Sequence, residues 1–295
     1  MSQWIVSLHD SGNIRKMKDA GADEILLAVP FFSLRPAHVF ALEELASLTD
    51  AIHACGLRAA VNCTRLFMEE DLPALRAFLR ELKELQVDTV YFADEGVLFE
   101  AARLDMADRL VYQPDTLISN ANDVRFYREQ GCQAVALSRE ITLEEIASIA
   151  SRQEGCEVLV HGRFSIMHSR RRLLSSYFSF LGREMEVEGR QDLTLREATR
   201  EAHMPIIEDD GGTHVFSEYT LQSYAQIRTL AEAGVARFRI DSIFHDDAWT
   251  LCALRDYHQI LAGEACASDV LTQRQKDENE HYSEGFYYTK TTLVK

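Results

Sequence analysis

Short apolar runs alternate with amphipathic stretches along most of the chain. In the amphipathic stretches, such as Leu72 to Leu85 and Leu143 to Ala150, apolar residues recur at intervals of three and four, as helices require. Alternation of strands with helices predicts a parallel sheet, and a count of eight strands favours a closed, TIM-like (β/α)8 barrel. The apolar runs predicted as strands are 4–9, 24–29, 58–63, 89–93, 110–113, 134–138, 157–162 and 237–242.

This spacing is interrupted once, between the seventh and eighth predicted strands, by residues 163–236. The interruption contains a basic loop, a predicted helix from Leu193 to Ala202, and a predicted β-hairpin from Glu208 to Ser217 centred on two glycines. Long excursions in compact domains are usually functional. We therefore expect one barrel domain, residues 1–265, with an insertion over 163–218.

Beyond Leu261 the sequence is polar through Gln273 to Glu280 and then aromatic at Phe286, Tyr287 and Tyr288. This pattern predicts an extended tail over residues 266–295. The tail is expected to pack on the barrel or on a partner, since aromatic residues are favoured at interfaces.

Composition excludes several classes of protein. A hydrophobic fraction of 46% and a charged fraction of 26% are those of a globular protein rather than a disordered or fibrous one. No apolar run approaches the length of about 20 residues that spans a bilayer, and no leader-like segment begins the chain, so a cytoplasmic protein without membrane contact is expected. The six cysteines lack Cys-x-x-Cys spacing and predict neither a zinc site nor a disulfide framework.

A net charge of -16 argues against loose attraction of the whole surface to a polyanion. Any contact with RNA must then be local. The basic cluster from Arg163 to Arg172 can supply such a contact. The alternative is that these arginines pair with nearby acidic residues.

Polar residues follow the predicted strands at the end where barrel enzymes carry their active sites. We expect them to form a polar bowl around one mouth, with alternatives in which Arg139 pairs with Glu140 and Asp94 caps a helix. Catalytic roles are predicted for Arg139, Glu140 and His161. The residues predicted at this mouth are His9, Asn62, Asp94, Glu95, Gln113, Arg139, Glu140, His161 and Asp241.

His161 is the leading candidate for catalysis. Its ring can titrate near neutral pH, exchange a proton or ligate a metal. It follows an apolar strand and precedes Gly162, which lets a ligand approach the backbone. The alternative is a structural histidine held by hydrogen bonds.

A second polar cluster is Glu208, Asp209, Asp210 and His214 in the predicted hairpin. Carboxylates beside a histidine can bind a divalent metal, although the spacing matches neither a His-Glu-x-x-His site nor a calcium loop. The alternative is a polar hairpin with a structural role. Ser165 lacks the Gly-x-Ser-x-Gly elbow of a nucleophilic serine.

Residues 157–175 resemble the signature of peptidase family U-32, the collagenase-like peptidases. Glu157, Gly162, Leu174 and Ser175 match that signature, whereas Ser165 and Arg172 occupy its two cysteine positions and Arg170 a glycine position. The segments 138–146, 208–214 and 285–291 resemble three further motifs of the family. The resemblance therefore spans nearly the whole chain.

The resemblance carries implications for cofactor and function. Family members use the signature cysteines for a four-iron four-sulfur cluster, which serine and arginine cannot ligate, so such a cluster is not expected; Cys63 can add one thiolate at most. Short, cysteine-lacking members resemble the TrhP-type proteins of prephenate-dependent tRNA uridine 5-hydroxylation. That activity implies tRNA, a cysteine-containing paralogue and a dicarboxylate such as prephenate as partners.

Within this resemblance the chain is either the enzyme component or an accessory subunit. One alternative is a collagenase-like peptidase, metal-assisted through His161 and the acidic hairpin; another is a non-catalytic module that binds RNA or protein. Guanidinium groups match carboxylate geometry. The residues predicted to bind substrate are Asn62, Gln113, Arg163, Ser165, His168, Arg170, Arg172, Glu208 and Asp241.

Overall fold

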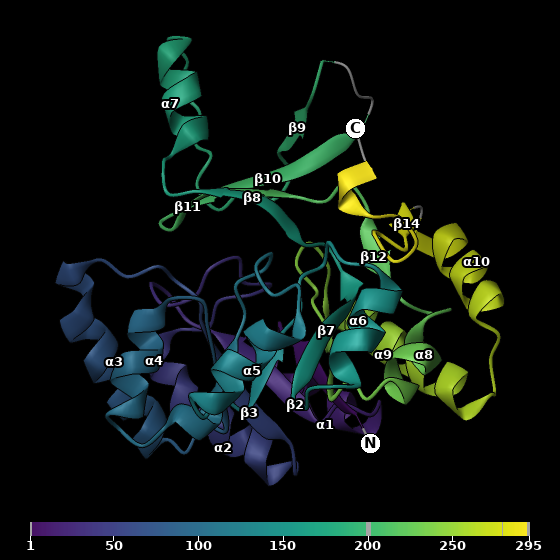
Figure 1. Cartoon of the computed structure of the whole chain (residues 1–295). Helices are drawn as coiled ribbons and strands as arrows, with labels where there is room; N and C mark the ends of the chain where they lie inside the picture. Colours follow the sequence, from purple (N-terminus) through teal and green to yellow (C-terminus); the bar gives the residue numbers. More distant parts are fainter. Residues whose placement is uncertain (1, 199–201, 279, 294–295) are drawn as a thin grey trace.

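A closed barrel of parallel strands forms the centre of the computed structural model, which describes residues 2–198, 202–278 and 280–293 (Figure 1). Neighbouring strands pair in chain order, and β13 pairs with both β7 and β1, which closes the barrel. All eight predicted strands are confirmed. Their bounds are β1 (Gln3–Ser7), β2 (Glu24–Ala28), β3 (Arg58–Cys63), β4 (Thr89–Phe92), β5 (Leu110–Tyr112), β6 (Ala134–Ala136), β7 (Cys156–Gly162) and β13 (Arg237–Ile240).

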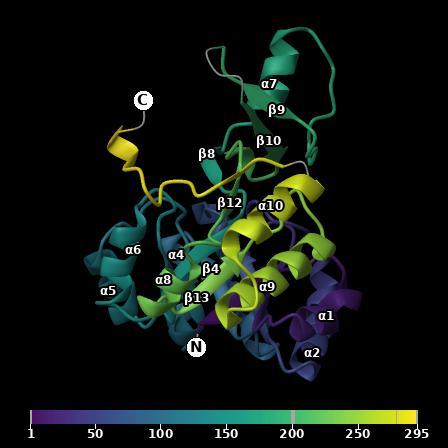
Figure 2. The ribbon, with the colours of Figure 1, turned by 90° about the vertical axis from the view of Figure 1, so that its right-hand side faces the viewer.

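Helices surround the barrel, as Figures 1 and 2 show. The helices predicted from Leu72 and Leu143 are confirmed as α3 and α6, and Thr142 with Glu145 forms a capping box at the start of α6. No described helix is long and apolar enough to cross a membrane. The surrounding helices are α1 (Ile14–Asp19), α2 (Leu45–Ala54), α3 (Leu72–Glu84), α4 (Glu95–Ala102), α5 (Ala121–Glu129), α6 (Leu143–Ala150), α8 (Ile227–Glu232) and α9 (Asp247–Ala262).

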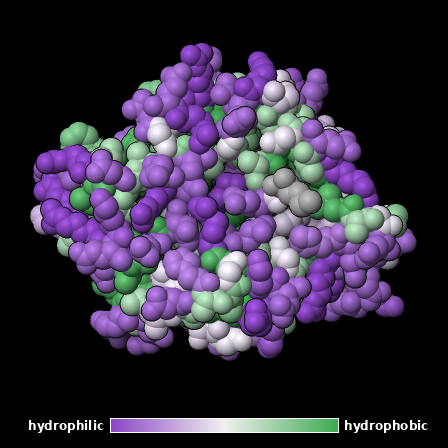
Figure 3. Space-filling model, turned by 90° about the horizontal axis from the view of Figure 1, so that it is seen from below, coloured by the Kyte–Doolittle hydropathy of each residue, from purple (hydrophilic) through white to green (hydrophobic). Residues whose placement is uncertain are grey.

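Successive side chains of a strand point to opposite faces, so every second side chain points into the barrel. The inward side chains of neighbouring strands form layers. An apolar layer in the middle consists of Ile5, Leu26, Ala60, Tyr91, Val111 and Ala134. At the amino ends of the strands lies a buried charged layer in which Arg237 contacts Glu24 and Glu157. The outer surface at this end is largely hydrophilic with scattered apolar side chains (Figure 3).

The insertion forms a separate antiparallel sheet above the carboxyl ends of the strands (Figures 1 and 2). Its strand order is β8-β11-β10-β9, and the pairing of β10 with β11 confirms the predicted hairpin. The elements of the insertion are β8 (Ser165–Ser169), α7 (Leu173–Phe180), β9 (Thr194–Arg196), β10 (His203–Asp209) and β11 (Gly212–Phe216).

The predicted helix from Leu193 to Ala202 is wrong where the structure describes it. Thr194–Arg196 is the strand β9, whose residues pair with His203 to Pro205 of β10. An exposed edge of the inserted sheet recruits this segment, and sheet pairing overrides its local helical pattern. Residues 199–201 lie outside the described part of the chain.

The expectation of an extended tail is also wrong in part, because Ala267–Glu278 is the helix α10. Arg274 of α10 is held by Asp256 of α9 through bonds of 2.6 and 2.9 Å. The chain then enters β14 (Tyr282–Ser283), which pairs with β12 (Thr220–Gln222), and β12 pairs with β7. The C-terminal residues thus lie against the outside of the barrel near the insertion (Figure 2).

Candidate functional site

Three arginine side chains meet at the carboxyl end of the barrel, which we call the mouth. Arg139 lies 2.8 Å from one oxygen of Asp115, and Arg35 pairs with the other oxygen. Arg239, from β13, lies 3.8 Å from Asp241. These five groups form the arginine cluster, and three guanidinium groups against two carboxylates leave it with an excess of positive charge.

The cluster is well shielded from water, and the attraction between its opposite charges is therefore stronger than it would be in water. Side chains of Arg35, Arg139 and Asp115 are only 12%, 8% and 13% exposed. Burial by itself would raise the pKa of Asp115, but Arg139 and Arg35 hold it well below its usual range. Burial also lowers the pKa of Arg139. A buried cationic excess of this kind favours an anionic ligand.

Backbone conformation at the mouth is strained. Arg35 and Asp115 have φ values of 51° and 69°, in the left-handed region that residues other than glycine seldom adopt. Such conformations cost on the order of 1–3 kcal/mol each and cluster at ligand sites, where surrounding structure enforces them. The strain supports the mouth as a binding site.

Two predicted amides position the cluster. The oxygen of the Gln113 side chain accepts a hydrogen bond from Arg239, and its nitrogen lies 3.4 Å from Asp115. Asn62 donates to the carbonyl of Leu34 at 3.1 Å and so fixes the loop that carries Arg35. These amides line the same cavity as the arginine cluster.

Apolar side chains complete the cavity at the mouth. Phe164 and Phe216 of the insertion line it, as does Ile243, which follows β13, and Arg163 and Ser165 lie beside them. Arg163 is held by the carbonyl of Ser217 at 2.9 Å and by Glu280 at 3.2 Å. The predicted residues Asn62, Gln113, Arg139, Arg163, Ser165 and Asp241 are therefore brought together at one cavity.

A sequence model of peptidase family U32 matches residues 10–293. The chain belongs to peptidase family U32. Among curated proteins, tRNA hydroxylation protein P2 of Bacillus subtilis is 26% identical over 264 residues, which cover 88% of this chain and 85% of that protein. The tRNA hydroxylation protein P of Escherichia coli is 23% identical, over 95% of this chain and 73% of that protein.

A solved structure supports the fold. The structure of the U32 peptidase Mk0906 superposes with a TM-score of 0.52 and covers 82% of this chain and 93% of that one. Sequence identity is 16%, so this likeness shows the fold alone. It agrees with the closed parallel barrel seen in this U32 protein.

The prediction that His161 lies at the mouth is wrong. A register irregularity between β7 and β13 sets His161 opposite Ile240, whose side chain belongs to the outer core. His161 is 1% exposed, and its Nδ1 lies 3.2 Å from the hydroxyl of Tyr257 on α9. The rings around it are those of Tyr224, Trp249, Tyr257 and Tyr282. It has the surroundings of a structural histidine.

Burial lowers the pKa of His161 to about 3, which predicts a pH-dependent stability. In the unfolded chain the pKa of a histidine is about 6.5. As the pH falls below that value, the unfolded chain binds a proton at His161 that the folded chain does not bind. The free energy of unfolding therefore falls by up to about 1.4 kcal/mol per pH unit. In urea titrations at pH 7 and pH 5, we expect the wild type to lose about 2 kcal/mol more than His161→Phe. The exposed-residue control His203→Phe should behave as wild type. Equal losses in all three proteins would contradict this assignment.

Two other predicted residues of the mouth serve neighbouring helices. Asp94 caps α4 by accepting from Gly96 at 2.7 Å, which confirms the alternative given for it. Glu95 accepts hydrogen bonds from Tyr112 and Tyr127 at 3.2 and 3.1 Å. Neither lines the mouth cavity.

Arg139 and Glu140 do not act as a pair. Arg139 turns to Asp115, whereas the backbone of Glu140 bonds Ser138 and Thr291 at 3.2 and 3.1 Å on the rim. The alternative in which they pair with each other is therefore wrong.

Predicted residues of the insertion divide into three kinds. Glu208 is 1% exposed and accepts from the amides of Leu174 and Ser175 at 2.8 and 3.2 Å, so it caps α7. Arg170 and Arg172 are exposed, and Arg172 pairs with Glu188 at 3.2 Å. The remaining one, His168, stacks on His214 with ring centres 4.6 Å apart.

A metal-assisted or serine hydrolase finds no support in this geometry. No group of three or more His, Cys, Asp or Glu side chains in the described ranges is arranged to hold a metal ion. His9 does lie 2.9 Å from the hydroxyl of Ser242, but Ser242 is 0% exposed. Asp247 accepts from the backbone amides of His9 and Asp10 rather than from the imidazole. This pair therefore lacks the access and the third member of a catalytic triad.

Sequence reasoning missed Arg35, Asp115 and Arg239. Arg239 carried a signal, because it alternates with Arg237 along an otherwise apolar strand and both must then face the barrel interior. Arg35 and Asp115 lie in loops after strands, where no periodicity marks them.

Proposed function

We propose that this U32 protein acts in prephenate-dependent 5-hydroxylation of a uridine in tRNA, and that the arginine cluster binds the carboxylates of prephenate. The observation that carries the proposal is the buried cationic excess at the mouth. The guanidinium forks of Arg139 and Arg239 match carboxylate geometry. Similarity to the tRNA hydroxylation proteins supports the reaction class.

The walls of the cavity favour an organic anion over inorganic phosphate. Phe164, Phe216 and Ile243 line the cavity and give it apolar walls. Asp241 and Gln113 act as positioning residues by holding Arg239. Ser165 adds a hydroxyl at the edge of the cavity.

Contact with tRNA is proposed for the exposed arginines that follow β8. Arg170, Arg171 and Arg172 are consecutive residues between β8 and α7 of the insertion and are all exposed. Phosphate contacts from arginine position a nucleic acid without reading its sequence. On a chain with a net charge of -16, this location confines the RNA to one face.

Residues at the cysteine positions of the family signature do not fit an iron–sulfur cluster. Ser165 and Arg172 offer no thiolate, and Arg172 is an exposed residue paired with Glu188. Cys63 is 0% exposed within the hydrophobic core, where burial raises the pKa of its thiol. We therefore propose an accessory role beside a cysteine-containing paralogue, with binding of the small acid as this chain's contribution.

Nucleoside mass spectrometry of total tRNA tests the proposal. Cells that lack this gene, alone and together with a cysteine-containing paralogue, should lose 5-hydroxyuridine-derived nucleosides. Wild-type protein should restore them, as should Arg125→Met, which alters an exposed ion pair on α5. Unchanged nucleosides in both deletions would refute the proposed function.

A further inference from the structure

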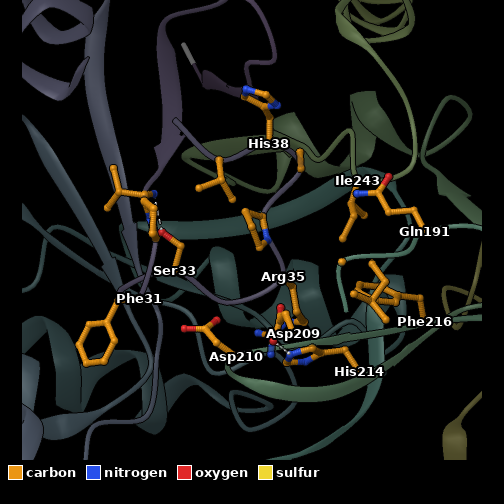
Figure 4. Close-up of a pocket in the computed structure, with 17 residues that line it drawn as sticks. Phe31, Ser33, Arg35, His38, Gln191, Asp209, Asp210, His214, Phe216 and Ile243 are labelled. Carbon is orange, nitrogen blue, oxygen red and sulfur yellow. Dashed lines mark hydrogen bonds and ion pairs between the residues drawn. The ribbon is translucent and has the colours of Figure 1, made fainter. Parts of the chain in front are cut away.

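A second pocket lies beside the mouth, between the loop that follows β2 and the inserted sheet (Figure 4). Its cavity volume is about 270 Å³, close to the lower end of the range of small-molecule sites. Its apolar walls include Pro30, Phe31, Ile207, Phe216 and Ile243, and its polar groups include His38, Gln191, Asp209, Asp210 and His214. We call it the side pocket.

The side pocket shares walls with the mouth. Arg35, Phe216 and Ile243 line both cavities. A molecule in the side pocket would therefore lie next to one held by the arginine cluster. The two cavities form adjoining compartments rather than separate sites.

The side pocket lacks the cationic excess of the mouth. Asp209 and Asp210 line it together with Arg35, and Asp210 pairs with Arg65 at 2.9 Å, so two carboxylates balance two guanidinium groups. The hydrogen bond from His214 helps to keep Asp209 charged, since it lowers the pKa of that carboxyl against the effect of burial. The side pocket thus favours a neutral ligand with hydrogen-bond donors.

His214 carries an unused polar atom. It is 0% exposed, and its Nε2 lies 3.3 Å from Asp209. Its Nδ1 has no hydrogen-bond partner among the described residues. If Nε2 donates to Asp209, Nδ1 is an acceptor, and a buried acceptor without a partner is costly. A ligand with an N–H group would satisfy it.

The unpartnered acceptor of the pocket suits one edge of uracil. That edge presents an imide N–H between two carbonyl oxygens. His214 Nδ1 can accept from the N–H. Apolar walls such as Phe31 and Phe216 suit the flat faces of a base, as in sites that receive a base turned out of its strand.

We infer that the side pocket receives a single pyrimidine base turned out of an RNA strand, beside the carboxylates held in the mouth. This inference rests on the proposed function and adds to it the place where the base binds. The exposed arginines after β8 would then hold the flanking phosphates.

Photo-crosslinking tests the inference. The full chain is irradiated with transcribed tRNA that contains 4-thiouridine in place of uridine, and the crosslinked peptides are identified by mass spectrometry. We expect crosslinks in residues 29–39 or 207–216, which line the side pocket. Crosslinks only elsewhere, or none, would overturn the inference.

Two variants and a control sharpen the experiment. Ala37→Trp fills the side pocket, and His214→Phe keeps the ring that stacks on His168 while removing the acceptor. Each should lower the crosslink yield in these peptides at least about tenfold, which corresponds to about 1.4 kcal/mol. Ala77→Trp, on an exposed position of α3, should have no effect. Thermal unfolding checks that each variant folds, and undiminished yields in a folded variant would overturn the inference.

Calorimetric titration with prephenate separates this inference from the proposed function. Both pocket variants should bind prephenate as wild type does, since neither changes the arginine cluster. If crosslinks depend on the side pocket but wild type binds no prephenate, the proposed function fails and the base pocket stands. If prephenate binds but crosslinks ignore the side pocket, the base pocket fails alone.

Discussion

Arg139→Met should weaken prephenate binding by about 100-fold, or about 3 kcal/mol, because loss of one partner from a shielded, hydrogen-bonded charge pair typically costs 2–5 kcal/mol. Arg139 is 8% exposed, so no water can substitute fully for its guanidinium. Without Arg139, the cluster has two guanidinium groups and two carboxylates, so its excess of positive charge is lost. Isothermal titration calorimetry on the purified chain measures the effect.

We expect Arg139→Met to fold, because Asp115 keeps its ion pair with Arg35 in this variant. Arg172→Met is the matched control, since it removes an arginine whose ion pair with Glu188 is 50% and 63% exposed. The control should bind prephenate within about twofold of wild type, as the small energy of exposed pairs implies. Similar losses in both variants would indicate a nonspecific effect of charge and would contradict the assigned site.

Arg237→Met should lower the free energy of unfolding by about 3–5 kcal/mol, the usual cost of leaving buried charges without their partner. Arg237 lies 2.5 Å from Glu24 and 3.0 Å from Glu157, and both carboxylates are almost wholly buried. Tyr91 donates to Glu157 at 2.6 Å, and Arg58 reaches Glu24 at 3.0 Å, so part of the network survives. Urea denaturation followed by circular dichroism measures the loss.

Arg125→Met provides the comparison for this stability effect. Its partner Glu129 lies one helical turn away, and both side chains are more than half exposed. We expect a loss below about 1 kcal/mol. If Arg237→Met also lowers the free energy of unfolding by less than about 1 kcal/mol, the charged layer at the amino ends of the strands contributes little to stability.

The periodicity of apolar residues was sufficient to predict the barrel, but not the strand β9 of the insertion or the C-terminal helix α10. Strands such as β2 and β7 are buried on both faces, and their apolar runs stand out in the sequence. β9 is exposed along its length and is defined by pairing with β10, which no local pattern reveals. α10 is mostly polar, and it is held by tertiary contacts: Ala267, Val270 and Leu271 pack against the core, and Arg274 pairs with Asp256.

Predictions for the site succeeded where side chains follow the regular alternation of a strand. Asn62 and Gln113 lie at the mouth because β3 and β5 are regular up to their ends. His161 was misplaced because β7 contains an irregularity that changes the side to which its last residues point. The positions of Arg35 and Asp115 depend on loop conformations with positive φ. A sequence signals such a conformation when the residue is glycine, but not when it is arginine or aspartate.

Closure of the barrel by β13 has a consequence for biosynthesis. The register joins Gln3 to Arg237, so the first strand remains without one neighbour until four-fifths of the chain has been made. Contacts of such sequence separation slow folding and prolong exposure of unpaired strand edges. During translation the nascent chain therefore carries seven barrel strands without the eighth, and the barrel closes only after residues 237–240 have left the ribosome.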